Sequence, residues 1–137
     1  MSLFTSLFSS KAPEQPSDKK ELVYLMGIGS YKVEIPGDEH YQTALEVICG
    51  ARRTHGVNCF ETASLILDNK NAVRVEIRRK HVGYLNPEMA SLFRQQLVAC
   101  GLPRGFGQCS AVIRSGWLSS DGRKGPFKVF LDLPTWS

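Results

Sequence analysis

The sequence predicts a small, mostly β protein with two helices, whose strands form one curled sheet or barrel. The chain has 137 residues, a length that suits one domain with one core. Apolar residues make up 42% of it, which is enough to fill such a core. Runs of alternating apolar and polar residues, typical of strands with one buried face, recur along the chain and leave only two stretches with helical spacing.

The N-terminal residues 1–21 differ from the rest and are expected to form a flexible tail and linker ahead of one domain over residues 22–137. Residues 3–8 hold two Leu-Phe pairs at helical spacing, whereas residues 11–21 are polar and interrupted by prolines. Such a linker buries too little apolar surface to offset its ordering entropy. The Leu-Phe segment could dock on a partner protein, fold back onto the domain or remain a frayed terminus.

The first part of the domain is expected to hold two short strands and the first helix. Residues 22–26 and 31–35 are β-like runs on either side of a glycine-rich turn. Residues 44–51 place apolar side chains at helical spacing, which predicts a helix that ends between Gly50 and Arg53. The apolar stripe of this helix consists of Ala44, Leu45, Val47, Ile48 and Ala51.

The middle of the chain predicts a long strand and then a β-hairpin. The long strand covers residues 57–67. Its candidate core positions are Val57, Phe60, Ala63, Leu65 and Leu67. In residues 72–78 Val or Ile alternates with charged side chains, so one face is buried and the other is charged. Arg79 and Lys80 predict the hairpin turn, and residues 81–85 form the returning strand.

A second helix and a final hairpin complete the expected fold. Asn86 is a helix N-cap, Pro87 suits the first helical position, and Gly101 ends the helix. The periodic face of this helix consists of Met89, Leu92, Phe93, Gln96, Leu97 and Cys100. Residues 109–114 and 127–133 then alternate as the two strands of the hairpin.

The polar face of that hairpin is a second candidate surface for a polyanion. Arg114 and Lys128 lie on it together with Phe130, an aromatic residue among polar neighbours. Phe130 could instead pack under a helix or under the N-terminal tail.

Charge and composition favour a binding protein over an enzyme. Seventeen Lys and Arg against thirteen Asp and Glu give a net charge of +4, which permits a polyanionic partner without requiring one. No C-x-x-C pair or zinc-ligand spacing is present, and no Ser or Cys has a recognisable nucleophile setting. We therefore expect no catalysis, no metal and no cofactor. Without an export signal or a run of roughly 20 apolar residues, we expect a cytoplasmic protein with no membrane association and with reduced, buried thiols.

Residues 67–75 (Leu-Asp-Asn-Lys-Asn-Ala-Val-Arg-Val) and 81–85 (His-Val-Gly-Tyr-Leu) resemble the HIRAN domain family in its free-standing bacterial form. That family has an Asn-Ala-[Ile/Val]-x-Val strand start and then a Val-Gly-[Tyr/His]-Leu strand that enters a helix. His40 and Tyr41 look like its first-loop aromatic position, and the resemblance spans residues 22–133. It implies a six-stranded OB-like or SH3-like barrel that binds DNA, in some members the free end of a single strand.

The expected binding site combines basic and aromatic side chains. Proteins that bind single strands use a basic groove and ring faces, and each stacked base contributes about 1–3 kcal/mol. We expect Lys70, Arg74 and Arg78 to contact phosphates and Tyr41 and Tyr84 to stack on bases, with DNA favoured over RNA. The complete expected site is His40, Tyr41, Asp68, Asn69, Lys70, Arg74, Arg78 and Tyr84.

Other interpretations of these residues remain open. The charged strand face could be a solvated face with a cross-strand ion pair, and Tyr84 could be partly buried. Asp68 and Asn69 stand where the family commonly has tyrosine and aspartate. The second hypothesis is therefore a protein-interaction module that keeps the barrel without the DNA-end pocket. Asn71 is expected to have a structural role in an Asx-turn.

Overall fold

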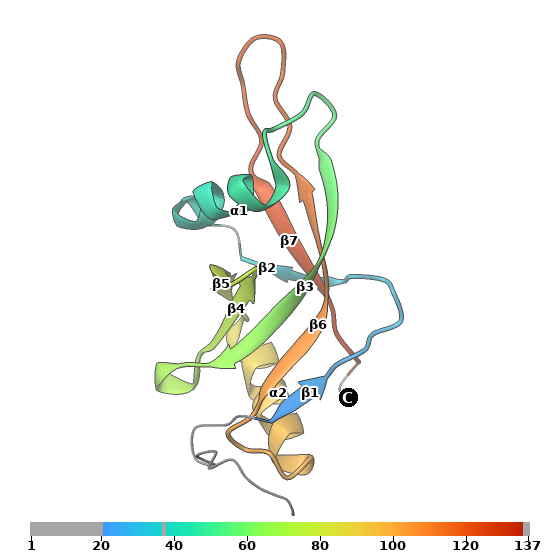
Figure 1. Cartoon of the computed structure of the whole chain (residues 1–137), viewed down its shortest axis with the longest axis vertical. Helices are drawn as coiled ribbons and strands as arrows, with labels where there is room; N and C mark the ends of the chain where they lie inside the picture. The colour runs from blue at the N-terminus through green and yellow to red at the C-terminus, as the bar shows by residue number, and fades with distance from the viewer. Residues whose placement is uncertain (1–20, 37, 136–137) are drawn as a thin grey trace, which may run out of the picture.

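The structure, a computed structural model, describes residues 21–36 and 38–135, which form one curled sheet with two α-helices (Figure 1). The strands are β1 (Leu22–Tyr24), β2 (Val33–Ile35), β3 (Val57–Leu67), β4 (Val73–Ile77), β5 (Lys80–Tyr84), β6 (Phe106–Ser115) and β7 (Phe127–Asp132). The α-helices are α1 (Gln42–Cys49) and α2 (Pro87–Ala99), and the short 3-10 segments are η2 (Glu39–Tyr41) and η3 (Asn69–Asn71). The expected mostly β fold with two helices is confirmed. The N-terminal Leu-Phe segment lies outside the described residues.

The sheet is an open half-barrel and not the closed barrel that was expected. Its main path runs β2-β7-β6-β3-β4-β5 with antiparallel neighbours, and β1 pairs in parallel with β6. The end strands β2 and β5 are not hydrogen-bonded to each other. They nevertheless come close, because a Cβ on Gly83 of β5 would lie 2.5 Å from Ile35 Cγ2 of β2. The two ends of the sheet therefore meet through side-chain packing.

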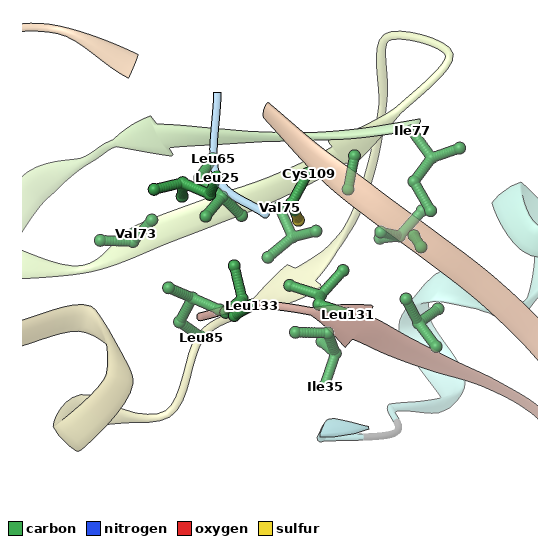
Figure 2. Close-up of a cluster of buried hydrophobic side chains, with 14 of the residues drawn as sticks. Leu25, Ile35, Leu65, Val73, Val75, Ile77, Leu85, Cys109, Leu131 and Leu133 are labelled. Carbon is green, nitrogen blue, oxygen red and sulfur yellow. The ribbon is translucent and has the colours of Figure 1, made fainter. Parts of the chain in front are cut away.

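The core lies between the inner face of the sheet and the two α-helices (Figure 2). Figure 2 shows side chains of β2, β3, β4, β6 and β7 converging on it. The helices contribute Leu45, Ile48, Ala90, Phe93 and Leu97, all of them buried. Burial of this apolar surface is the main stabilising contribution to the fold. None of the helices in the described ranges is long and apolar enough to span a membrane.

Four residues that the sequence assigned to apolar core faces are exposed instead, and one of them, Ala51, lies just beyond the end of α1. Phe60 is 59% exposed. It lies three residues before the buried Ala63, an odd number, so the alternation of β3 places the two side chains on opposite faces of the sheet. Val47 and Cys100 are also exposed, at the margins of the apolar stripes of their helices. Of the four thiols expected to be buried, only Cys109 is; Cys100 is exposed, and Cys49 and Cys59 are partly buried.

The predicted start of the second helix is confirmed, whereas the predicted hairpin turn is displaced by one residue. Asn86 Oδ1 accepts a hydrogen bond of 2.8 Å from the Met89 N–H, so Asn86 caps α2. The turn consists of Arg78 and Arg79, both with left-handed backbone (φ 52° and 65°), and Lys80 already belongs to β5. Two positive φ angles are the geometry of a type I′ turn, which favours Asn and Gly. Arg78 therefore leaves the strand face on which alternation had placed it.

This strained turn leads to a stability prediction. Replacing Arg79 by glycine is expected to raise the free energy of unfolding by about 1 kcal/mol, because left-handed backbone carries a steric cost for residues with a Cβ. Urea denaturation measures the change. Arg79→Ala is the matched control, since it removes the same charge but keeps the Cβ. A glycine variant no more stable than the alanine variant would show that the turn is unstrained.

Candidate nucleic-acid interface

Four aromatic rings stand side by side where the two ends of the sheet meet. His40 and Tyr41 come from η2, and His81 and Tyr84 come from β5. Successive ring centroids lie 5.2, 4.8 and 4.7 Å apart in the order His40, Tyr41, His81, Tyr84. We call these four residues the aromatic row. The structure thus brings together three residues of the expected site and adds His81, which the sequence had not indicated.

Local capping and the packing of Gly83 position the aromatic row. Asp38 caps η2, because its Oδ1 accepts a hydrogen bond of 2.9 Å from the His40 N–H. On β5, His81 Nε2 lies 3.0 Å from the carbonyl oxygen of Gly83. The close approach of Ile35 to Gly83 holds β2, and with it the segment that leads to η2, against β5. Rings from segments about 40 residues apart in sequence therefore meet.

Asp68 links the aromatic row to the charged residues. Its Oδ2 accepts a hydrogen bond of 3.3 Å from the Tyr84 hydroxyl and lies 3.5 Å from Arg74 Nη1. Its Oδ1 accepts a hydrogen bond of 2.8 Å from the backbone N–H of Asn69. The Asn69 N–H is the main cause that lowers the pKa of Asp68 below its ordinary value, and Arg74 and Tyr84 lower it further. Asp68 is therefore a carboxylate at neutral pH.

The lowered pKa of Asp68 has a testable consequence. A carboxyl group whose pKa is lower in the folded than in the unfolded chain stabilises the fold above its unfolded pKa, and this contribution is lost as the pH falls through the folded pKa. A carbon-13 NMR titration is expected to place the Asp68 midpoint below the ordinary aspartate value. In Tyr84→Phe the midpoint should move up, because a hydrogen bond to the charged form is removed. A wild-type midpoint at or above the ordinary value would contradict the described hydrogen bonds.

Two of the three predicted phosphate ligands are engaged by carboxylates. Besides Asp68, Arg74 contacts Glu76, with Nε 2.9 Å from Oε2, although that pair is not aligned as a hydrogen bond. Arg78 donates two hydrogen bonds, of 3.0 and 2.7 Å, to Glu61 of β3 and is not close to Asp68 in any described interaction. The alternative of a cross-strand ion pair thus describes Arg78. Lys70 is exposed on η3 beside Asn69.

Arg94 of α2 holds the segment that carries Lys70, a role that was not predicted from the sequence. Its Nε donates a hydrogen bond of 3.0 Å to the Asn71 carbonyl oxygen. Its Nη2 donates to the carbonyl oxygens of Asp68 at 3.2 Å and Ala72 at 3.0 Å. An Asx-turn was expected of Asn71, but the side chain that accepts a backbone N–H in this segment is that of Asp68. Asn71 has a φ of 66°, a conformation that asparagine tolerates better than most residues.

An open groove lies between α2 and the 68–72 segment. It has a volume of about 830 Å³, and its lining includes Lys70, Leu85, Arg94 and Val98. This volume falls in the range of small-molecule pockets. The groove therefore offers mostly apolar walls with two cationic side chains.

The His, Cys, Asp and Glu side chains of the described residues form no cluster for a metal ion, and two of the cysteines have raised pKa values. Residues 21–36 and 38–135 contain no group of three or more His, Cys, Asp or Glu side chains that could hold a metal ion. Burial, together with a hydrogen bond to Cys59, raises the pKa of the Cys49 thiol to about 12. Burial also raises the pKa of Cys109 to about 12. Both groups are therefore thiols at neutral pH, which are poor nucleophiles and metal ligands.

Comparisons of this chain with models of protein families, with curated proteins and with solved structures find no match.

Proposed function

We propose that this chain is a non-catalytic, HIRAN-like module with an OB-like half-barrel that binds single-stranded DNA at the aromatic row. The observation that carries the proposal is the gathering of four rings at the surface beside Arg74, with Tyr84 38% exposed. Ring faces bind bases of any sequence, because every base has a π-face. DNA is proposed ahead of RNA because of the HIRAN resemblance.

In the proposed complex, bases stack on Tyr41 and Tyr84 and phosphates contact Lys70 and Arg74. Arg74 has to exchange part of its pairing with Asp68 and Glu76 for a phosphate. The exposed Lys70 needs no such exchange with a partner that the structure describes. Phosphate contacts release counterions, so the affinity should fall steeply as salt is added.

Fluorescence anisotropy with short single strands, carrying a free or a blocked 3′ end, tests the proposal at low and moderate salt. Tyr41→Leu and Tyr84→Leu are each expected to weaken binding by about 5- to 150-fold, the equivalent of one lost stacked base. Tyr84→Phe is the matched control: it keeps the ring and removes only the hydroxyl bond to Asp68, so most of the affinity should remain. Wild-type affinity in both leucine variants would exclude the aromatic row as the binding site. A preference for the free end would support end recognition despite Asp68 and Asn69.

A protein-interaction module is the second candidate function, and the groove beside α2 favours it. Mostly apolar grooves along a helix are typical docking sites for amphipathic segments. Val98 is an exposed apolar side chain in its wall. If this groove carries the function, Val98→Glu should abolish binding of the partner protein and leave the affinity for oligonucleotides unchanged. Aromatic-row variants that lose the binding of oligonucleotides, and no other binding, would argue against this candidate.

A further inference from the structure

A second set of aromatic side chains lies on the outer face of the sheet, away from the core. The register places Phe60 of β3, Val112 of β6 and Phe130 of β7 in one row across three adjacent strands. Val112 is fully buried but does not belong to the main core cluster, so its neighbours on the outer face cover it. Phe60 remains 59% exposed at one end of this row. An apolar outer surface thus continues beyond the core.

The spacing of these rings suits the bases of an extended strand. Adjacent strands in a sheet lie about 4.8 Å apart, so Phe60 and Phe130, two strands apart, are separated by about 10 Å. The ring of Tyr31 stands edge-on to Phe60 with the centroids 5.8 Å apart. The separation of about 10 Å between Phe60 and Phe130 leaves room for a separate base on each ring.

Two cations border the rings. Arg114 of β6 lies directly opposite Lys128 of β7, and both are exposed. The Arg114 guanidinium sits over the Phe130 ring, 5.2 Å from its centroid. Within residues 21–36 and 38–135 neither cation forms an ion pair with a carboxylate, unlike Arg74 and Arg78. A phosphate that contacts them therefore displaces no carboxylate of the described residues.

Two acidic residues lie near these rings, and one of them is buried and hydrogen-bonded. Asp132, on the same face, is buried, and its carboxylate accepts hydrogen bonds from backbone N–H groups of residues 29 and 31. Glu34 of β2, opposite Phe130, is exposed. We call Tyr31, Phe60, Phe130, Arg114 and Lys128 the outer patch.

We propose that the outer patch is a second contact surface for single-stranded nucleic acid, with bases on Phe60 and Phe130 and phosphates on Arg114 and Lys128. The inference rests on the proposed function for its class of ligand, but it uses none of the residues of the aromatic row. A strand longer than the aromatic row can hold makes contacts at both surfaces. Binding of longer strands therefore depends on Phe60, and binding of the shortest strands does not.

The test is a comparison of strands of about 4 and about 16 nucleotides, the limits of site size for single OB folds. With the longer strand, proton–nitrogen NMR spectra of the full chain should show shifted amides in residues 58–62, 110–114 and 128–131. Phe60→Ser, and separately the pair Arg114→Gln with Lys128→Gln, should weaken binding of the longer strand about 5- to 100-fold. Val47→Ser, which removes an exposed apolar side chain on α1, is the matched control and should bind like wild type.

The outcomes separate this inference from the proposed function. If Tyr84→Leu weakens binding of the longer strand and Phe60→Ser does not, the outer patch is not a contact surface and the aromatic row stands. If Phe60→Ser weakens it and Tyr84→Leu does not, the outer patch binds alone and the aromatic row is excluded. Patch amides that shift only as the chain itself is concentrated would identify a self-association surface and overturn the inference.

Discussion

Replacing Gly83 by alanine is expected to lower the free energy of unfolding by about 2–4 kcal/mol. The new methyl group would lie 2.5 Å from Ile35 Cγ2, and the φ of 153° at this position is one that side chains rarely adopt. Relief requires β2 to move away from β5, which would also separate Tyr41 from His81. Urea denaturation measures the loss of stability, and the same variant should bind oligonucleotides more weakly.

Two further variants separate the steric clash from the backbone strain. Gly122→Ala adds a methyl group at a φ of 90° with no atom within 4 Å, so it reports the strain alone and should cost less. In an Ile35→Ala background the clashing Cγ2 is absent, and Gly83→Ala should then cost less than in the wild type. Equal costs in both backgrounds would show that β2 and β5 are not in contact.

Replacing Asp132 by alanine is also expected to cost about 2–4 kcal/mol. Both oxygens of this buried carboxylate lie 3.0 Å from the Gly29 nitrogen, and Oδ1 also accepts a bond of 3.3 Å from the Tyr31 N–H. Without the carboxylate these backbone groups lose their partner, and the segment that places Tyr31 beside Phe60 loosens.

Thermal or urea unfolding checks the Asp132 prediction. Glu34→Ala is the matched control, because it removes an exposed carboxylate on the neighbouring strand. The control should change the stability by less than about 0.5 kcal/mol. An Asp132→Ala variant as stable as that control would mean that the β1–β2 segment is held by other contacts.

Periodicity and capping predicted most of the fold because they are local properties. The alternation in residues 73–77 gave β4 its buried face, and Asn86 marked the start of α2. The same rules misplaced Phe60, because an apolar residue on the outer face of a strand cannot be told from a core residue by type alone. Arg78 and Arg79 form a turn that usually takes Asn and Gly, so no turn signal marked its position.

Within the candidate site, only the residues that belong to the family-like motifs could be predicted from the sequence. Resemblance pointed to Tyr41 and Tyr84, and the structure places them in one aromatic row. His81 lies between those two rings, yet its sequence neighbours give no hint of a ring contact. Arg94 was missed for a similar reason: its partners are backbone carbonyl oxygens more than 20 residues away. Such contacts depend on tertiary structure.

The proposed function requires that single-stranded DNA stacks on the aromatic row. Photochemical cross-linking tests it most directly, with a single strand that carries 5-iodouracil and mass spectrometry of the cross-linked peptides. We expect cross-links at Tyr41, His81 or Tyr84, and fewer of them as salt is added. Cross-linked peptides that contain none of these residues, from a strand shown to be bound, would contradict it.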